Sequence, residues 1–386
     1  MTELRNLLER QVASGSLSGA VAMIARGDDV DVQVAGSHDL EGTAPMARDS
    51  LVRIASITKP ITAAAVLMLI EDGRIAMDDP IGQWLPELAT PMVVRTPTAP
   101  VGDVVPARRA ITVEDLLTSR AGYGFPSEFS APAVGPLSTE LFDEPRRDGR
   151  DPQHFLPPDE WMAALSQIPL LHQPGDAWLY NTCSDLQGIL IARVTGQPFP
   201  EFLAERLFDP LGMVDSGFHV PADKLDRFTS YYRTDPAGGL ELADAPGGQW
   251  SSPPAFPSGA GGLVGTIDDW HAFARMLLAD GCARDQQLLS PGSVRQMTTD
   301  QLTQSQRDGG RLFLKGQGWG FGGSVDVVAV DPWNLPGRYG WGGGTGTAAH
   351  LTPSTGGVTI LFTQLAAAGP VPSALMRDFW HFAAGG

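Results

Sequence analysis

The chain has 386 residues, of which 42% are hydrophobic, and 27 basic against 44 acidic residues give a formal net charge of −17. A chain of this length can bury a large core without help from a disulfide or a metal. Its nine tryptophans and 16 phenylalanines need such a core, which excludes an intrinsically disordered protein. The negative charge argues against nucleic acid and anionic membranes as partners, because phosphate binding needs a basic surface.

The predicted elements include both helices and strands. In chain order, they are an amphipathic helix from residue 4 to 12, strands at 19–25 and 30–35, an apolar helix at 56–72, a short helical piece at 113–119, a helix at 184–195, a loop at 234–262, strands at 345–351 and 358–364, and a helix at 371–383. Strands therefore lie near both ends of the chain, with helices and loops between them. This order predicts one α/β domain built from residues 1–75 and 255–386, a helical domain inserted at 76–254, and an active site in the cleft between the two.

No targeting or membrane-spanning segment is recognisable. The longest apolar stretch, residues 60–70, is too short to cross a bilayer, and the N-terminus lacks a basic-then-apolar leader. We therefore expect a cytoplasmic protein. Two cysteines, Cys183 and Cys282, predict neither a disulfide framework nor a zinc site. We expect no metal and no cofactor, because no metal-ligand or phosphate-binding motif is present.

The first candidate site is the tetrapeptide Ser56-Ile57-Thr58-Lys59, at the start of the apolar helix. Residues three apart in a helix share a face, so the Ser56 hydroxyl and the Lys59 amine can meet. The partial positive charge at a helix N-terminus favours an alkoxide and disfavours a second cation. The spacing therefore predicts a neutral Lys59 amine able to take a proton from Ser56. Only three of the 27 basic residues are lysines, and arginine cannot replace lysine in this role because it does not give up its proton.

Two further segments are candidates for a site. Tyr180 stands in a turn directly before the helix at 184–195, where its hydroxyl can point into a cleft. Residues 339–347 carry a run of glycines after Trp341, which lets a backbone approach a substrate closely and offer its N–H groups. Taken alone, each segment is equally compatible with a packed aromatic residue or a tight turn. No Gly-x-Ser-x-Gly motif is present, and nothing links the seven scattered histidines to a triad.

Together and in this order, the three segments resemble the serine β-lactamase and penicillin-binding superfamily, whose marks are Ser-x-x-Lys, a tyrosine element and a strand that ends in glycines. Within it, the chain looks most like the class C β-lactamase-like group, and especially the family VIII carboxylesterases. The resemblance covers residues 17–364. It implies a β-lactamase/DD-peptidase-like fold, in which an antiparallel sheet is flanked by helices and joined by an inserted, mostly helical domain.

The resemblance also implies roles for individual residues. Ser56 would be the nucleophile, and Lys59 and Tyr180 would form the proton-transfer pair, with the base in each step left open. The backbone N–H groups of Ser56 and Gly344 would bind the oxyanion. Substrate-binding residues would be Trp341, Gly342, Gly343, Thr182 and Tyr123, although Tyr123 is equally compatible with a structural role.

Two departures from the β-lactamase pattern favour ester hydrolysis. Thr182 occupies the place of an asparagine that holds the substrate amide, and Trp341 occupies the place of a lysine that binds the β-lactam carboxylate. We therefore expect a serine carboxylesterase that cleaves short-chain acyl esters of small molecules through an acyl-Ser56 intermediate. The alternatives are an acyltransferase to an alcohol, a β-lactamase or D-amino-acid peptidase, and a non-catalytic binding protein of the same fold. Residues 93–109 and 126–155 are expected to shape the cleft.

Overall fold

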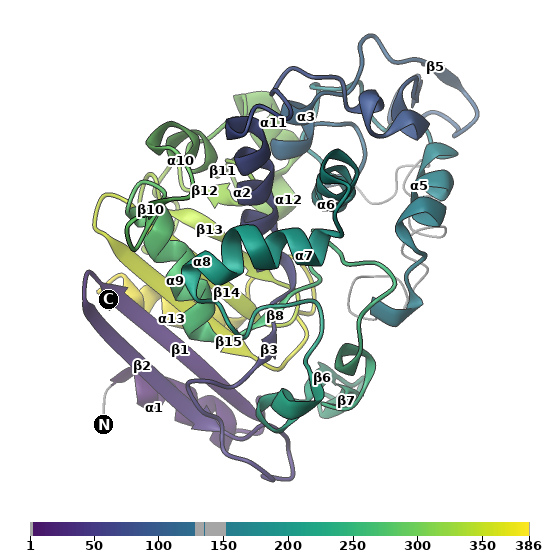
Figure 1. Cartoon of the computed structure of the whole chain (residues 1–386). Coiled ribbons are helices and arrows are strands. Elements are labelled where there is room, and N and C mark those ends of the chain that lie inside the picture. Colours follow the sequence, from purple (N-terminus) through teal and green to yellow (C-terminus); the bar gives the residue numbers. More distant parts are fainter. Residues whose placement is uncertain (1–2, 128–134, 136–151, 386) are drawn as a thin grey trace.

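The structure is a computed structural model that describes residues 3–127, 135 and 152–385. Its main sheet has seven antiparallel strands, with helices packed against it (Figure 1). Its strand order is β11-β12-β13-β14-β15-β1-β2. Each neighbouring pair is antiparallel. The strands are β1 (Gly19–Arg26), β2 (Asp29–Gly36), β11 (Gly318–Trp319), β12 (Ser324–Val325), β13 (Tyr339–Gly343), β14 (Thr347–Thr352) and β15 (Gly357–Thr363). Segments from both ends of the described chain thus complete one sheet.

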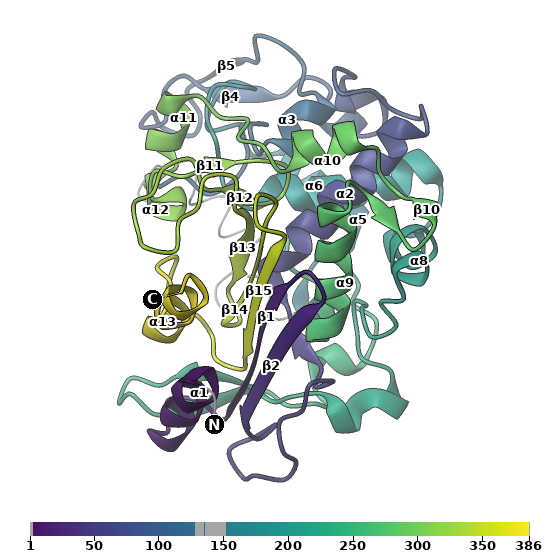
Figure 2. The same cartoon turned by 90° about the vertical axis from the view of Figure 1, so that its left-hand side faces the viewer.

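Helices cover both faces of this sheet. Figure 2 shows α1 (Glu3–Ala13) and α13 (Ala374–Ala383) on one face, with α9 (Ile267–Leu278) and α2 (Thr58–Glu71) on the other. The other helices are α3 (Val113–Leu117), α5 (Pro158–Ser166), α6 (Thr182–Thr195), α7 (Phe199–Leu203), α8 (Asp209–Leu211), α10 (Pro291–Met297), α11 (Gln304–Gly309) and α12 (Arg311–Leu314). The short strand pairs outside the main sheet are β3 (Val52–Arg53) with β8 (Val264–Gly265), β4 (Met92–Val94) with β5 (Val104–Pro106), β6 (Tyr231–Thr234) with β7 (Leu240–Asp244), and β9 (Cys282–Ala283) with β10 (Gln286–Gln287).

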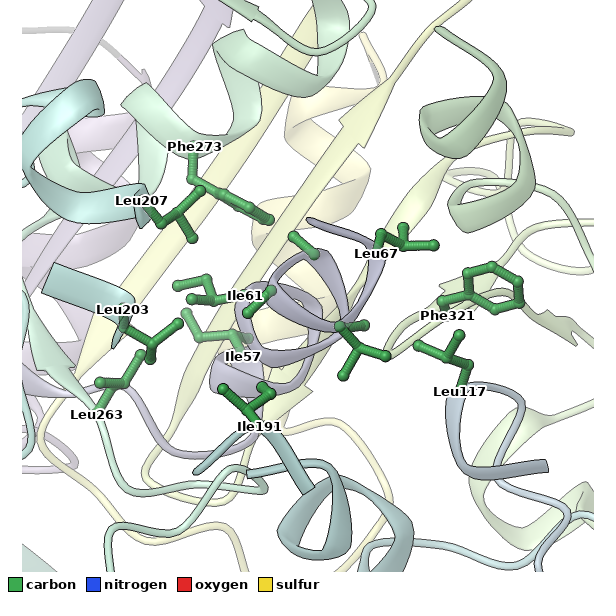
Figure 3. Packing of buried hydrophobic residues seen from close by; sticks show 14 of the residues in the cluster. Ile57, Ile61, Leu67, Leu117, Ile191, Leu203, Leu207, Leu263, Phe273 and Phe321 are labelled. Carbon is green, nitrogen blue, oxygen red and sulfur yellow. The ribbon is translucent and has the colours of Figure 1, made fainter. Parts of the chain in front are cut away.

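Helix α2 is the centre of the main hydrophobic core. Its residues from Thr58 to Leu69 are all buried, as expected of a helix that is apolar all round. Side chains from several elements surround it, among them Leu117, Ile191, Leu207 and Phe273 (Figure 3). The first turn of α2, which carries Lys59, is therefore held rigidly inside the protein.

Most of the predicted elements are confirmed, with boundary differences that have physical reasons. The helix predicted at 56–72 begins at Thr58, because residues Ala55–Ile57 form a separate 3₁₀ turn. The helix predicted at 184–195 begins at Thr182 and ends before Gly196, whose φ of 71° is left-handed. The C-terminal helix begins only at Ala374, where the Ser373 side chain caps it. The predicted loop at 234–262 instead includes part of the hairpin formed by β6 and β7.

The predicted division into two domains stays a prediction. The sheet takes its strands from residues 19–36 and 318–363, and the segment between them is mostly helical. Most of the loop at 126–155 lies outside the described residues. No helix in the described parts of the chain is both long and apolar enough to cross a membrane.

Candidate active site

Ser56 lies in the strained turn that leads into α2. The preceding residue, Ala55, has a φ of 47°, a left-handed conformation that costs free energy for a residue with a side chain. Ser56 follows in the 3₁₀ turn and is half-buried at the wall of a cavity. Local strain at a polar residue facing a cavity is typical of a functional site.

The turn after β13 holds this strained segment in place. The Thr347 hydroxyl donates to the carbonyl of Ile54 at 2.9 Å, and the Thr345 hydroxyl donates to the carbonyl of Arg53 at 2.5 Å. Glycine is required at position 343, because a Cβ there would lie 2.7 Å from the Ile54 carbonyl oxygen. The glycine run thus lets the end of β13 lie directly against the backbone that presents Ser56.

Lys59 is almost fully buried, with 1% of its surface exposed. Its Nζ donates to the Ser56 Oγ at 3.1 Å and to the Ala260 carbonyl at 2.6 Å. The same amine lies 4.7 Å from the centre of the Tyr180 ring. The contact predicted between Ser56 and Lys59 is therefore present, although Ser56 lies in the 3₁₀ turn rather than in the α-helix itself.

Tyr180 comes from the turn before α6 and meets Ser56 from the opposite side. Its hydroxyl donates to the Ser56 Oγ at 2.8 Å. Its backbone exchanges two hydrogen bonds of 2.9 Å with Phe125, and its ring stacks on Phe313 with the ring centres 4.7 Å apart. Asn181 then adopts a φ of 85° before the helix begins. The phenol is thus fixed by backbone and ring contacts, and its oxygen reaches the nucleophile.

Trp341 makes a contact that the sequence reasoning missed. Its indole Nε1 donates to the Tyr180 hydroxyl oxygen at 2.8 Å, while its ring packs edge-on against Trp319 at 4.9 Å. The sequence analysis assigned Trp341 only to substrate binding, in the place of a lysine. The signal that could have revealed the contact is the indole N–H, a donor that usually has a partner when partly buried. Tyr180 therefore donates to Ser56 and accepts from Trp341.

The cavity beside these residues has a volume of about 580 Å³. Ser56, Tyr180 and Trp341 lie at its wall together with Gly342, Gly343 and Gly344. It extends past the turn after β13 to the segment before α13, where its apolar lining includes Phe313, Leu314, Trp333, Leu365, Met376 and Trp380. The Gly344 carbonyl accepts from the Ala367 N–H at 2.8 Å, which joins this segment to the turn. The volume suits a drug-sized ligand rather than a single ion or water molecule.

The structure does not bring every predicted residue to the cavity. Tyr123 is 3% exposed, lies in the main hydrophobic core and donates to the Ile168 carbonyl at 3.1 Å. Thr182 is fully buried at the start of α6. Neither residue is among those lining the cavity. The structure thus corrects the prediction that Tyr123 and Thr182 are substrate-binding residues, because neither reaches the cavity. Both are held in the interior by packing around α3 and α6, which the motif spacing does not reveal.

Cys183 is packed inside the protein. It is fully buried in the main core next to Thr182, and burial raises the pKa of its thiol to about 12. A thiol with so high a pKa is not a nucleophile at neutral pH. Among the described residues, Lys59 and Tyr180 are the two side chains that donate a hydrogen bond to the Ser56 hydroxyl.

Residues 4–378 match the family described as Beta-lactamase. The chain belongs to the Beta-lactamase family. The chain is 38% identical over 364 residues to protein Rv1367c of Mycobacterium tuberculosis, covering 91% of this chain and 86% of that protein. It is 31% identical over 386 residues to the esterase EstB of Burkholderia gladioli, covering 94% and 90%.

A solved structure has the same fold. EstCE1, described as a hydrolase with promiscuous acyltransferase activity, superposes with a TM-score of 0.78 at 23% identity, covering 98% of this chain and 97% of that one. The antiparallel sheet flanked by helices is therefore the β-lactamase and penicillin-binding fold. The esterase relationship predicted from the sequence is confirmed, and the family membership supports a serine hydrolase.

Proposed function

We propose that this protein hydrolyses carboxylic esters through an acyl intermediate on Ser56. The observation that carries the proposal is the convergence of two proton-carrying groups on one hydroxyl oxygen. The Lys59 amine and the Tyr180 phenol lie 3.1 and 2.8 Å from the Ser56 Oγ, within reach for direct proton transfer.

In the first step, the Ser56 Oγ attacks the ester carbonyl and its proton passes to the pair formed by Lys59 and Tyr180. The oxyanion is bound by the backbone N–H groups of Ser56 and Gly344, two residues that line the cavity. The pair then returns the proton to the leaving alcohol. A water molecule, activated by the same pair, attacks the acyl-enzyme and releases the acid.

Trp341 supports the proton transfers without carrying a charge. Its N–H remains directed at the Tyr180 oxygen at 2.8 Å, so it stabilises negative charge that develops there. The adjoining cavity of about 580 Å³ is large enough for a short acyl group together with a bulkier alcohol.

The test compares the wild type with Ser56→Ala and with Ser324→Ala. Ser324 lines the same cavity, but its hydroxyl donates to the Gly340 carbonyl at 2.9 Å, so it serves as a matched control. Ser56→Ala is expected to lower turnover of a short-chain nitrophenyl ester by roughly 10⁶-fold and to abolish labelling by a fluorophosphonate, whereas Ser324→Ala retains both. Full turnover by Ser56→Ala would exclude the acyl-Ser56 intermediate.

A second candidate is acyl transfer to an alcohol, favoured by the extension of the cavity beyond the nucleophile toward α13. The same acyl-enzyme would then react with an alcohol instead of water. Product analysis with an added alcohol separates the two reactions. Action on β-lactams or D-amino-acid amides is less favoured, because Trp341 stands where the lysine of the third motif would bind a carboxylate. A chromogenic cephalosporin tests this directly.

A further inference from the structure

A chain of hydrogen bonds connects Lys59 to a buried carboxylate on α6. The Lys59 Nζ donates to the Ala260 carbonyl at 2.6 Å. At the other end of that same peptide unit, the N–H of Gly261 donates to the Ser258 Oγ at 3.1 Å. The Ser258 hydroxyl in turn donates to the Asp185 Oδ1 at 2.6 Å. One peptide group and one hydroxyl thus lie between the amine and the carboxylate.

Asp185 occupies an unusual environment for a purely structural residue. It is 1% exposed, and its contacts are the Ser258 hydroxyl and the Ala260 N–H at 3.1 Å. Burial raises the pKa of its carboxyl to about 6, whereas its hydrogen bonds and the charge of Lys59 act in the opposite direction. A buried carboxylate bound only by neutral donors costs folding free energy. Buried groups whose pKa is shifted toward neutral pH are frequent at functional sites.

In the part of the chain that the structure describes, no second basic side chain acts on Asp185. From α2 it faces Lys59, and from its own helix it faces the neutral thiol of Cys183. On α3, Asp115 lies near that thiol, and its charge is balanced by an ion pair with Arg109. Among the described residues, Lys59 is therefore the basic side chain that interacts with Asp185.

We propose that Asp185 is a positioning residue that holds the Lys59 amine against Ser56 by polarising the Ala260 carbonyl through Ser258. Hydrogen bonds in a chain strengthen one another in a low-dielectric interior. An ionised Asp185 makes Ser258 a better acceptor for the Gly261 N–H. This in turn makes the carbonyl of the same peptide a better acceptor for Lys59. The inference rests on the proposed function, because it assigns Asp185 a part in the same proton transfers.

The test is Asp185→Asn, which keeps the shape and the acceptor oxygen but removes the charge. We expect kcat for a nitrophenyl ester to fall about 10- to 100-fold, with KM nearly unchanged. In the wild type, activity should rise with pH through about 6, as Asp185 ionises. This rise forms the acidic limb of the pH–rate profile. In Asp185→Asn the limb should disappear, so kcat should be low and independent of pH across this range. A merely structural role would lower the stability without removing the limb.

Asp269→Asn is the matched control. Asp269 is also buried, with a pKa raised to about 6, but it accepts hydrogen bonds from Ser216 and from the Asp215 N–H rather than from the chain that reaches Lys59. This variant should retain the wild-type limb. Wild-type kcat in Asp185→Asn, or persistence of its limb near pH 6, would overturn the proposal.

Two measures keep the test decisive. If Asp185→Asn does not fold, Ser258→Ala breaks the same chain by removing one hydroxyl, and a wild-type kcat in that variant would refute the role of the chain. Failure of the esterase proposal is recognised separately, because the wild type would then show no Ser56-dependent ester turnover. In that case, the pH dependence of Ser56 labelling by a fluorophosphonate still reports the reactivity of the hydroxyl, and loss of its limb near pH 6 in Asp185→Asn would support the inference.

Discussion

Replacement of Trp341 by phenylalanine tests whether its indole N–H contributes to the chemistry. The substitution removes the donor that lies 2.8 Å from the Tyr180 oxygen and keeps an aromatic ring beside Trp319. A hydrogen bond to a neutral oxygen contributes about 0.5–1.5 kcal/mol, and one to a charged oxygen about 1.5–3 kcal/mol. Because Tyr180 exchanges a proton during the proposed reaction, the larger range applies in the transition state. We expect kcat to fall about 10- to 100-fold.

The assay is steady-state turnover of a nitrophenyl ester, normalised to the number of active sites titrated with a fluorophosphonate. Trp319→Phe is the matched control, because it removes the same atoms from the neighbouring ring. The indole N–H of Trp319 makes no hydrogen bond to any residue that the structure describes. This control should lower the thermal stability while kcat per titrated site stays within a few-fold of the wild type. Equal kcat values for Trp341→Phe and the wild type would refute the argument that the indole N–H stabilises the transition state.

Two further predictions concern buried groups away from Ser56. Tyr123→Phe should leave kcat/KM unchanged and lower the free energy of unfolding by about 1 kcal/mol. The reason is that the Tyr123 hydroxyl donates to the Ile168 carbonyl and does not line the cavity. A marked rise in KM would show that Tyr123 contacts the substrate after all. Burial raises the pKa of Asp269 from 3.8 to about 6, so its contribution to stability is present at low pH and lost as the pH rises through 6. The free energy of unfolding of Asp269→Asn, minus that of the wild type, should therefore be about 2–3 kcal/mol larger at pH 7 than at pH 4. Urea unfolding of both proteins at the two pH values measures this difference, and an equal difference at both would show that the pKa of the carboxyl is not raised.

The limits of sequence reasoning are clearest at Trp341 and Tyr123. Both were expected to bind the substrate, because motif position shows which strand or turn carries a residue but not which atom faces which neighbour. In the structure, the Trp341 indole N–H donates to the Tyr180 hydroxyl oxygen beside the cavity, and the Tyr123 side chain is buried in the core. The strained φ of Ala55 and the chain from Asp185 to Lys59 were equally unpredictable, since neither produces a pattern in the sequence.

The sequence by itself determined the local features of this protein. Residues three apart lie side by side in a helical turn, so the spacing predicted the contact between Ser56 and Lys59, although Ser56 lies in the 3₁₀ turn before α2. Glycine in a left-handed conformation ends α6 at Gly196 for a similarly local reason. Only the tertiary structure decided that Tyr180, 124 positions from Ser56, donates to its hydroxyl, and that Trp341, 161 positions beyond Tyr180, donates to the phenol. Those contacts depend on how α6 and β13 pack around α2, and the packing of distant segments is set by the whole core rather than by any short stretch of the chain.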